Sequence, residues 1–158
     1  MKFSTYILNI VVAAFLYGAS SVAPVLAGEA ELNELFDSLA EPEQENWESI
    51  ESAIWREWSD SGSRSMNLLL NRGKKAMSDG RMSIAIDHFT ALTDHAPDFA
   101  EGYNGRATAY YLTGAIGPAL GDLRIALQLN PRHFGALRGL GIILEEMERP
   151  NDALEVYQ

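Results

Sequence analysis

The chain has 158 residues, no cysteine, and 12 basic against 22 acidic side chains, which gives a formal net charge of −10. A hydrophobic content of 47% provides a core for one domain, so the acidic balance indicates a solvated surface and not disorder. This charge repels phosphate backbones and excludes nucleic acid as an expected partner. Without cysteine there is no disulfide framework, thiol lipid anchor or thiolate metal site, so packing alone must stabilise the fold.

Residues 1–27 have the pattern of a secretory signal peptide. Lys2 is their only charged side chain, an almost wholly apolar run follows over residues 6–17, and the segment ends in Val25-Leu26-Ala27. Because the run is shorter than the ~20 residues that span a bilayer, we expect cleavage after Ala27. The protein is then periplasmic or secreted, in the bacterial cell envelope. An uncleaved membrane anchor is the alternative.

Residues 28–65 predict two short amphipathic helices and a polar linker. The first helix, over residues 30–40, has one apolar face, made of Leu32, Leu35, Phe36 and Leu39. Pro42 favours the start of the second helix, which carries a stripe of Trp47, Ile50, Ile54 and Trp58. We interpret this hairpin as the cover for the open end of a helix stack, with an exposed partner site as the alternative. Trp55 lies partly off the stripe and is the tryptophan that we expect to be most exposed.

The rest of the chain, residues 66–158, repeats with a 34-residue period. Four columns share this register: Pro97 and Pro131; Gly73, Ala107 and Gly141; Ala85, Ala119 and Ala153; and Phe89, Leu123 and Tyr157. Each unit predicts a pair of helices, in which the small residues sit where the helices cross and the bulky ones pack nearby. Gly80 and Gly114 suit the turn between paired helices, and Glu148 departs from that column.

The run Tyr103-Asn104-Gly105-Arg106-Ala107, followed by Tyr110, Ala119, Ala126 and Pro131, resembles the tetratricopeptide repeat (TPR). Residues 66–99 and 100–133 match as full units, and residues 134–158 match an incomplete third unit. Residues 93–101 and 131–137 also resemble an uncharacterised group of exported α-proteobacterial TPR proteins, which brings no known activity. The resemblance implies an all-α fold, a right-handed superhelical stack of antiparallel helix pairs (a TPR solenoid) after the cleavable signal peptide. We expect residues from Pro150 onward to be poorly held, because the third unit looks truncated.

No pattern typical of catalysis is present, and we predict no enzyme, no cofactor and no metal. His88 and His95 are seven residues apart, which is about 10 Å along a helix and too far for two ligands of one ion. There is no nucleophile elbow and no phosphate-binding glycine loop. We interpret Arg72 and Arg106, which share the 34-residue register, as structural, with ligand contact as the alternative. His133 is expected at a helix end, bonded to free carbonyls or packed on the next unit.

In TPR proteins the first helix of each unit lines a concave face, so the resemblance implies a protein-binding groove. The predicted groove residues are Asn67, Lys74, Met77, Glu101, Asn104, Thr108, Tyr111, Arg138, Ile142 and Glu145. This mixture of amide, charged and apolar side chains suits an extended peptide segment. Leu70 and Gly139 stand where related carboxylate clamps carry polar residues, so recognition of a carboxyl terminus is not expected.

The sequence therefore predicts a periplasmic scaffold or adaptor that binds a protein or an extended peptide segment. It predicts contact with a membrane only through an uncleaved signal segment. The alternative from another class is a regulatory subunit or enzyme of the cell envelope with a small-molecule site. A further alternative is a structural protein of the envelope that an uncleaved first helix holds at the membrane.

Overall fold

The computed structural model describes residues 23–41 and 45–158, and every regular element in these ranges is an α-helix. The described residues divide into two units, one up to Glu57 and the other Trp58–Gln158. The helices in chain order are α2 (Ala23–Leu39), α3 (Trp47–Trp58), α4 (Arg64–Ser78), α5 (Met82–His95), α6 (Ala100–Leu112), α7 (Ile116–Leu129), α8 (Phe134–Glu146) and α9 (Pro150–Tyr157). The prediction of an all-α chain is thus confirmed for the described residues.

The proposed signal peptide lies mostly outside the described residues, since these begin at Ala23. Helix α2 runs without a break past Ala27, the expected cleavage position. Among the described residues, no helix is both long and apolar enough to cross a membrane. Export therefore stays a prediction.

The amino-terminal helices differ from the predicted hairpin in where the second helix begins. Leu32, Leu35, Phe36 and Leu39 of α2 are half-buried, which agrees with the predicted apolar face. Helix α3 begins at Trp47 and not at Pro42, because Glu45 and Asn46 form a turn and the Asn46 carbonyl accepts from the backbone N–H groups of Ser49 and Ile50. Residues 42–44 themselves lie outside the described residues.

The stripe on α3 is buried toward its carboxyl end. Ile54 and Trp58 are buried, whereas Trp47 at the start of the helix is 50% exposed. The expectation that Trp55 is the most exposed tryptophan is wrong. Its indole N–H donates to the Glu51 carboxylate one turn earlier, at 3.3 Å, and the ring is half-buried. Trp47 is the first residue of its helix and therefore has no preceding helical turn to pack on.

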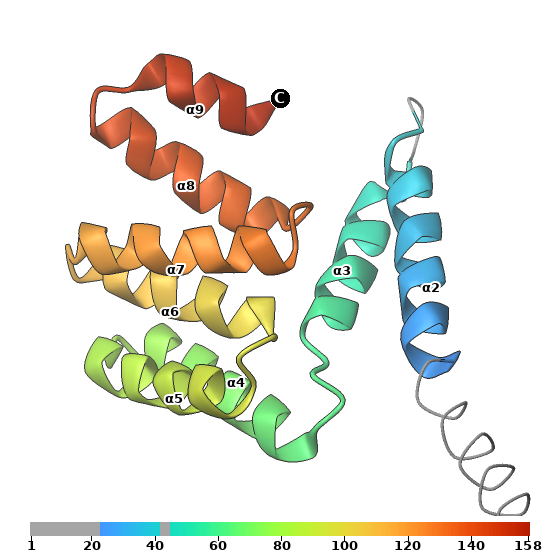
Figure 1. Ribbon diagram of the computed structural model, residues 1–158, viewed down its shortest axis with the longest axis horizontal. Coiled ribbons are helices and arrows are strands. Elements are labelled where there is room, and N and C mark those ends of the chain that lie inside the picture. Colours follow the sequence, from blue (N-terminus) through green and yellow to red (C-terminus); the bar gives the residue numbers. More distant parts are fainter. Residues whose placement is uncertain (1–22, 42–44) are drawn as a thin grey trace, which may run out of the picture. The chain divides into compact units, whose positions relative to one another are not determined.

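The six helices of the second unit form sequential pairs, α4 with α5, α6 with α7 and α8 with α9, as predicted. Figure 1 shows the pairs stacked in chain order, from α4 and α5 to α9 at the carboxyl terminus. The second helix of each pair also packs on the first helix of the next, and α6 contacts both α4 and α8. The first helices of the three units are therefore neighbours.

Glycine permits close contacts between helices in the stack. A Cβ atom added to Gly73 of α4 would lie 2.5 Å from Cε1 of Phe89, and one added to Gly105 of α6 would lie 2.7 Å from the same atom. The Phe89 ring, which is fully buried, therefore packs on the backbone of both α4 and α6. In the third unit Tyr157 packs on Gly141 in the same way. The small and bulky columns of the repeat meet as the sequence predicts.

The turn between paired helices is the same in all three units. The backbone N–H groups of Arg81, Ala115 and Arg149 donate to the carbonyls of Ala76, Tyr110 and Leu144, at 2.8, 2.9 and 2.9 Å. Such a bond closes a helix end that is followed by a residue with a positive φ. That residue is Gly80 (φ 73°), Gly114 (φ 76°) and, in the third unit, Glu148 (φ 60°).

Glu148 is strained, because a side chain in the left-handed region costs about 1–2 kcal/mol per residue. Glu148→Gly should therefore raise the free energy of unfolding by about 1 kcal/mol, since part of the gain is lost to the greater freedom of glycine in the unfolded chain. Thermal unfolding followed by circular dichroism measures this difference. Gly114→Ala is the matched control and should destabilise, although a Cβ there meets no atom within 4 Å. A Glu148→Gly protein that melts below the wild type would contradict this account of the turn.

Candidate protein-binding site

The ten predicted groove residues lie on the three neighbouring first helices, α4, α6 and α8, and we call this set the first-helix face. Thr108, Arg138 and Glu145 are exposed, and six others are half-buried: Asn67, Lys74, Met77, Asn104, Tyr111 and Ile142. Glu101 differs from the rest, because it is only 2% exposed. A partner on this face would therefore not meet its carboxylate directly.

Asn67 of α4 holds the linker that precedes this helix. Its side-chain oxygen accepts from the backbone N–H of Ser61 at 2.9 Å and from the Ser61 hydroxyl at 2.7 Å. Its side-chain N–H donates to the Asp60 carboxylate at 2.8 Å. One amide thus binds both the backbone and an acidic side chain of a non-helical segment.

Lys74, two turns further along α4, joins the linker to the second repeat. Its ammonium donates to the hydroxyl of Ser59 at 3.1 Å and forms an ion pair with Glu101 of α6 at 2.7 Å. The other carboxylate oxygen of Glu101 accepts from Asn104 at 3.0 Å and lies 3.1 Å from Nε2 of His133. Three side chains therefore share one buried carboxylate, which connects α4, α6 and the start of α8.

His133 defines the proton positions in this network. It caps the amino terminus of α8, where Nδ1 accepts from the backbone N–H of Ala136 at 3.2 Å. Because Nδ1 accepts, the proton of a neutral imidazole is on Nε2, which donates to Glu101. His133 was expected either to bond free carbonyls at a helix end or to pack on the next unit. It packs on the next unit, but it accepts an N–H group at the start of α8 instead of bonding carbonyls. That part of the expectation is wrong, because position 133 precedes α8 rather than ending a helix.

Trp58 covers this network. Its ring stacks on the His133 ring, with centroids 4.4 Å apart and planes 16° apart, and contacts Phe134 at a centroid distance of 4.7 Å. The His133 side chain is fully buried as a result of its contacts, and Trp58 is 8% exposed. The residue predicted as the end of the α3 stripe thus also packs on the start of the third repeat.

The part of the first-helix face on α6 and α8 is more open. Tyr111 of α6 donates its hydroxyl to the Glu146 carboxylate of α8 at 2.5 Å, and this bond raises the pKa of the tyrosine above its usual value. Arg138 and Glu145 are exposed on α8. These side chains offer charged and aromatic contacts of the kind that dominate protein interfaces.

Arg106 does not belong to this site. Its guanidinium forms a bidentate pair with Asp122 of α7, at 2.7 and 2.9 Å, and also donates to Thr93 of α5 at 2.8 Å. The hydrogen bond to Asp122 raises the pKa of Arg106 and outweighs the opposing effect of burial. The structural interpretation of Arg106 is therefore confirmed, and the pair ties α5, α6 and α7 together.

Sequence reasoning missed the pairing of Asp122, the contact of Trp58 with His133 and the hydrogen bonds of His133. A signal for Asp122 was present in the sequence. Arg106 precedes Ala107 of the small column, and Asp122 precedes Leu123 of the bulky column, and these two columns are expected to pack against each other. The helix crossing that joins Ala107 and Leu123 therefore also brings Arg106 and Asp122 together. Trp58 had no such signal, because the path of the linker follows no period.

The buried carboxylate predicts a pH-dependent stability. Burial opposes its ionisation, but the hydrogen bond from His133 and the charge of Lys74 outweigh burial, so the pKa of Glu101 lies below its ordinary value of 4.5. A lowered pKa contributes stability that is present above the unfolded value and is lost as the pH falls through the folded value. Glu101→Gln should cost about 1.5–3 kcal/mol at pH 7, and this cost should shrink as the pH falls below 4.5.

The measurement is the melting temperature of the wild type and of Glu101→Gln at several pH values between 7 and 3. Glu155→Gln, a change at an exposed glutamate of α9, is the control and should melt close to the wild type throughout. A difference between wild type and Glu101→Gln that stays constant down to pH 3 would show that the carboxylate is not held in its charged form.

Two curated proteins with similar sequences have the repeat in their names. The chain is 34% identical over 128 residues to a TPR repeat-containing protein of Rhizobium etli, and the alignment covers 80% of this chain and 63% of the relative. It is 29% identical over 87 residues to the small glutamine-rich tetratricopeptide repeat-containing protein 2 of Saccharomyces cerevisiae, covering 55% of this chain and 25% of the relative. The chain thus spans less than two thirds of the length of either relative. No family model matches it.

Proteins built from this repeat generally act as scaffolds for protein interaction and are generally not enzymes. Three observations agree in this chain: the 34-residue register, the sequential helix pairs and the similarity to named repeat proteins. The chain is thus similar to TPR repeat-containing proteins in its sequence period, its helix pairing and its alignments.

Proposed function

We propose that the protein is an exported scaffold or adaptor of the bacterial cell envelope, that it is not an enzyme, and that it binds a segment of a protein partner on the first-helix face. The observation that carries this proposal is the contact between that face and the chain's own linker. Asn67 binds the backbone N–H of Ser61 at 2.9 Å, and Lys74 binds the hydroxyl of Ser59 at 3.1 Å. The face thus has the chemistry to hold a non-helical peptide.

This contact favours peptide recognition for a physical reason. A backbone N–H is present in every peptide, so an amide that accepts from it provides affinity without demanding one sequence. Specificity then comes from side chains further along the face, where Tyr111, Arg138 and Ile142 present aromatic, cationic and apolar surface on α6 and α8. On α4 the linker already engages Asn67 and Lys74, so we expect the partner to lie over α6 and α8.

Export is supported by the sequence of residues 1–27, with the single charge of Lys2 before an apolar run and Val25-Leu26-Ala27 at its end. The mature protein should begin at Gly28 and should be recovered from the periplasm of a Gram-negative host. Mass spectrometry of the purified amino terminus tests this part of the proposal. An exported protein that keeps Met1 would argue for the anchored alternative.

Site-specific photocrosslinking tests the binding face in the same host. A benzophenone amino acid replaces Thr108, which is exposed on α6, or Gln128, which is exposed on the second helix α7, as the matched control. A discrete adduct with one partner should form from position 108 and should disappear when Arg138→Ala is added. Adducts from position 128 alone, or an adduct from position 108 that Arg138→Ala leaves unchanged, would place binding elsewhere.

A further inference from the structure

The 34-residue register relates the Arg106–Asp122 pair to a different pair of residues in the first repeat. Asp122 neutralises Arg106 with two hydrogen bonds, at 2.7 and 2.9 Å. The equivalent positions one period earlier are Arg72 and His88. The arginine is thus retained in the first repeat, but an imidazole stands in place of its carboxylate.

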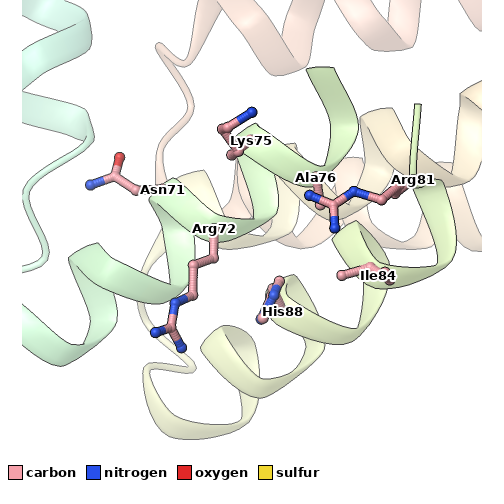
Figure 2. A pocket seen from close by; sticks show the side chains of 7 residues that line it. All are labelled: Asn71, Arg72, Lys75, Ala76, Arg81, Ile84 and His88. Carbon is pink, nitrogen blue, oxygen red and sulfur yellow. The ribbon is translucent and has the colours of Figure 1, made fainter. Parts of the chain in front are cut away.

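The charge of Arg72 is consequently not balanced by a carboxylate at the position equivalent to Asp122. It is exposed, and within residues 23–41 and 45–158 its side chain forms no ion pair or hydrogen bond. Arg72 and His88 line a pocket of about 380 Å³ between α4 and α5, together with Asn71, Lys75, Ala76, Arg81 and Ile84. Figure 2 shows these side chains around the pocket, with Arg72 and Lys75 coming from α4 and with Ile84 and His88 coming from α5.

The pocket is cationic although the chain has a net charge of −10. Its lining contains Arg72, Lys75 and Arg81 and no carboxylate. Asp79, outside the lining, pairs with both Lys75 and Arg81 at 2.7 Å, and their hydrogen bonds, that of Lys75 first, lower the pKa of Asp79. One carboxylate therefore fixes two of the cations in place but leaves an excess of two positive charges for a ligand.

We propose that this pocket binds a small phosphate monoester. A guanidinium without a carboxylate partner donates two parallel hydrogen bonds to a phosphate, and a doubly charged phosphate balances the excess of two cations. Ile84, which is 41% exposed, supplies apolar contact for the organic group of the ester. The volume of about 380 Å³ leaves room for a small ester. This site is separate from the first-helix face and does not depend on the function proposed for it.

Titration of the full chain with phenyl phosphate, inorganic phosphate and benzoate, followed by calorimetry and by amide chemical shifts at low salt, tests the proposal. Phenyl phosphate should bind most tightly, with shifts in α4 and α5, because it alone offers both the dianion and an apolar group. Inorganic phosphate should bind several-fold more weakly. Benzoate bound as tightly as phenyl phosphate would overturn the assignment to phosphate.

The decisive variant is His88→Asp, which gives the first repeat the carboxylate that Asp122 gives the second. It should reduce the affinity for phenyl phosphate by about tenfold or more and should leave the protein folded or more stable, because Arg72 then gains a partner. Arg72→Ala should cause a similar loss. His88→Asn, which adds no charge, and Arg124→Ala, at an exposed arginine of α7, are the controls and should bind within about twofold of the wild type. Unchanged binding by His88→Asp, or equal losses in Arg72→Ala and Arg124→Ala, would overturn the proposed site.

Discussion

Phe89→Ala should destabilise the Trp58–Gln158 unit by about 3–5 kcal/mol, the largest effect that we expect from any single substitution. The Phe89 side chain is fully buried and fills the space between the backbones of α4 and α6. Its removal leaves a cavity that two helices cannot close without breaking their contacts with α5. Chemical denaturation followed by circular dichroism measures the change.

The glycines that face this ring provide an independent check. A Cβ added by Gly73→Ala would come within 2.5 Å of Phe89, and one added by Gly105→Ala within 2.7 Å, so each change should cost about 1–3 kcal/mol through overpacking. Gly121 lies within helix α7, and a Cβ there meets no atom within 4 Å. Gly121→Ala should therefore raise the free energy of unfolding by about 0.5–1 kcal/mol. If Gly73→Ala and Gly105→Ala were as stable as the wild type or more stable, the ring would not pack on these two glycines.

Asp122→Ala should destabilise the same unit by about 3 kcal/mol, because it leaves the mostly buried guanidinium of Arg106 without its carboxylate. The loss exceeds that expected for a surface ion pair, since both side chains are largely removed from water. The carboxylate also orients Arg106 toward Thr93 of α5, so the variant loosens the contact between two repeats. The free energy of unfolding at pH 7 is the quantity to compare.

The third repeat suggests how to rescue this variant. It carries Leu140 and Val156 at the positions of Arg106 and Asp122. Replacing a buried ion pair by apolar residues of similar volume is often neutral or stabilising, so Arg106→Leu combined with Asp122→Val should recover most of the stability lost in Asp122→Ala. A double variant less stable than the single one would mean that the pair contributes through more than its mutual charge.

The repeat made most of the fold predictable. The 34-residue period places Gly73 and Phe89 on paired helices, and the structure brings them into contact as expected. The positive φ of Gly80 and Gly114 follows from the same period, and so does the strain at Glu148. These features depend on local sequence, because each repeat makes the same contacts with its neighbours.

The electrostatic contacts were less predictable, because they break the period. Glu101 lies 3.1 Å from Nε2 of His133, and Trp58 stacks on the imidazole ring, but no repeating column of residues predicts either contact. Arg106 is paired with a carboxylate and Arg72 is not, because the first repeat has His88 at the position where the second has Asp122. The 34-residue register alone treats these two positions as equivalent. The first-helix face was predicted as a set of residues, but the burial of Glu101 depends on these tertiary contacts.

The central claim is that the protein binds its partner on the first-helix face. The most direct test is the affinity of the Arg138→Ala variant for the crosslinked partner segment. Arg138 is exposed on α8, so its loss should leave the melting temperature unchanged, and the affinity should fall by about tenfold or more if it anchors the partner. Arg124→Ala, which removes the same charge from α7, should bind like the wild type. An affinity that Arg138→Ala leaves intact and Arg124→Ala reduces would contradict the claim.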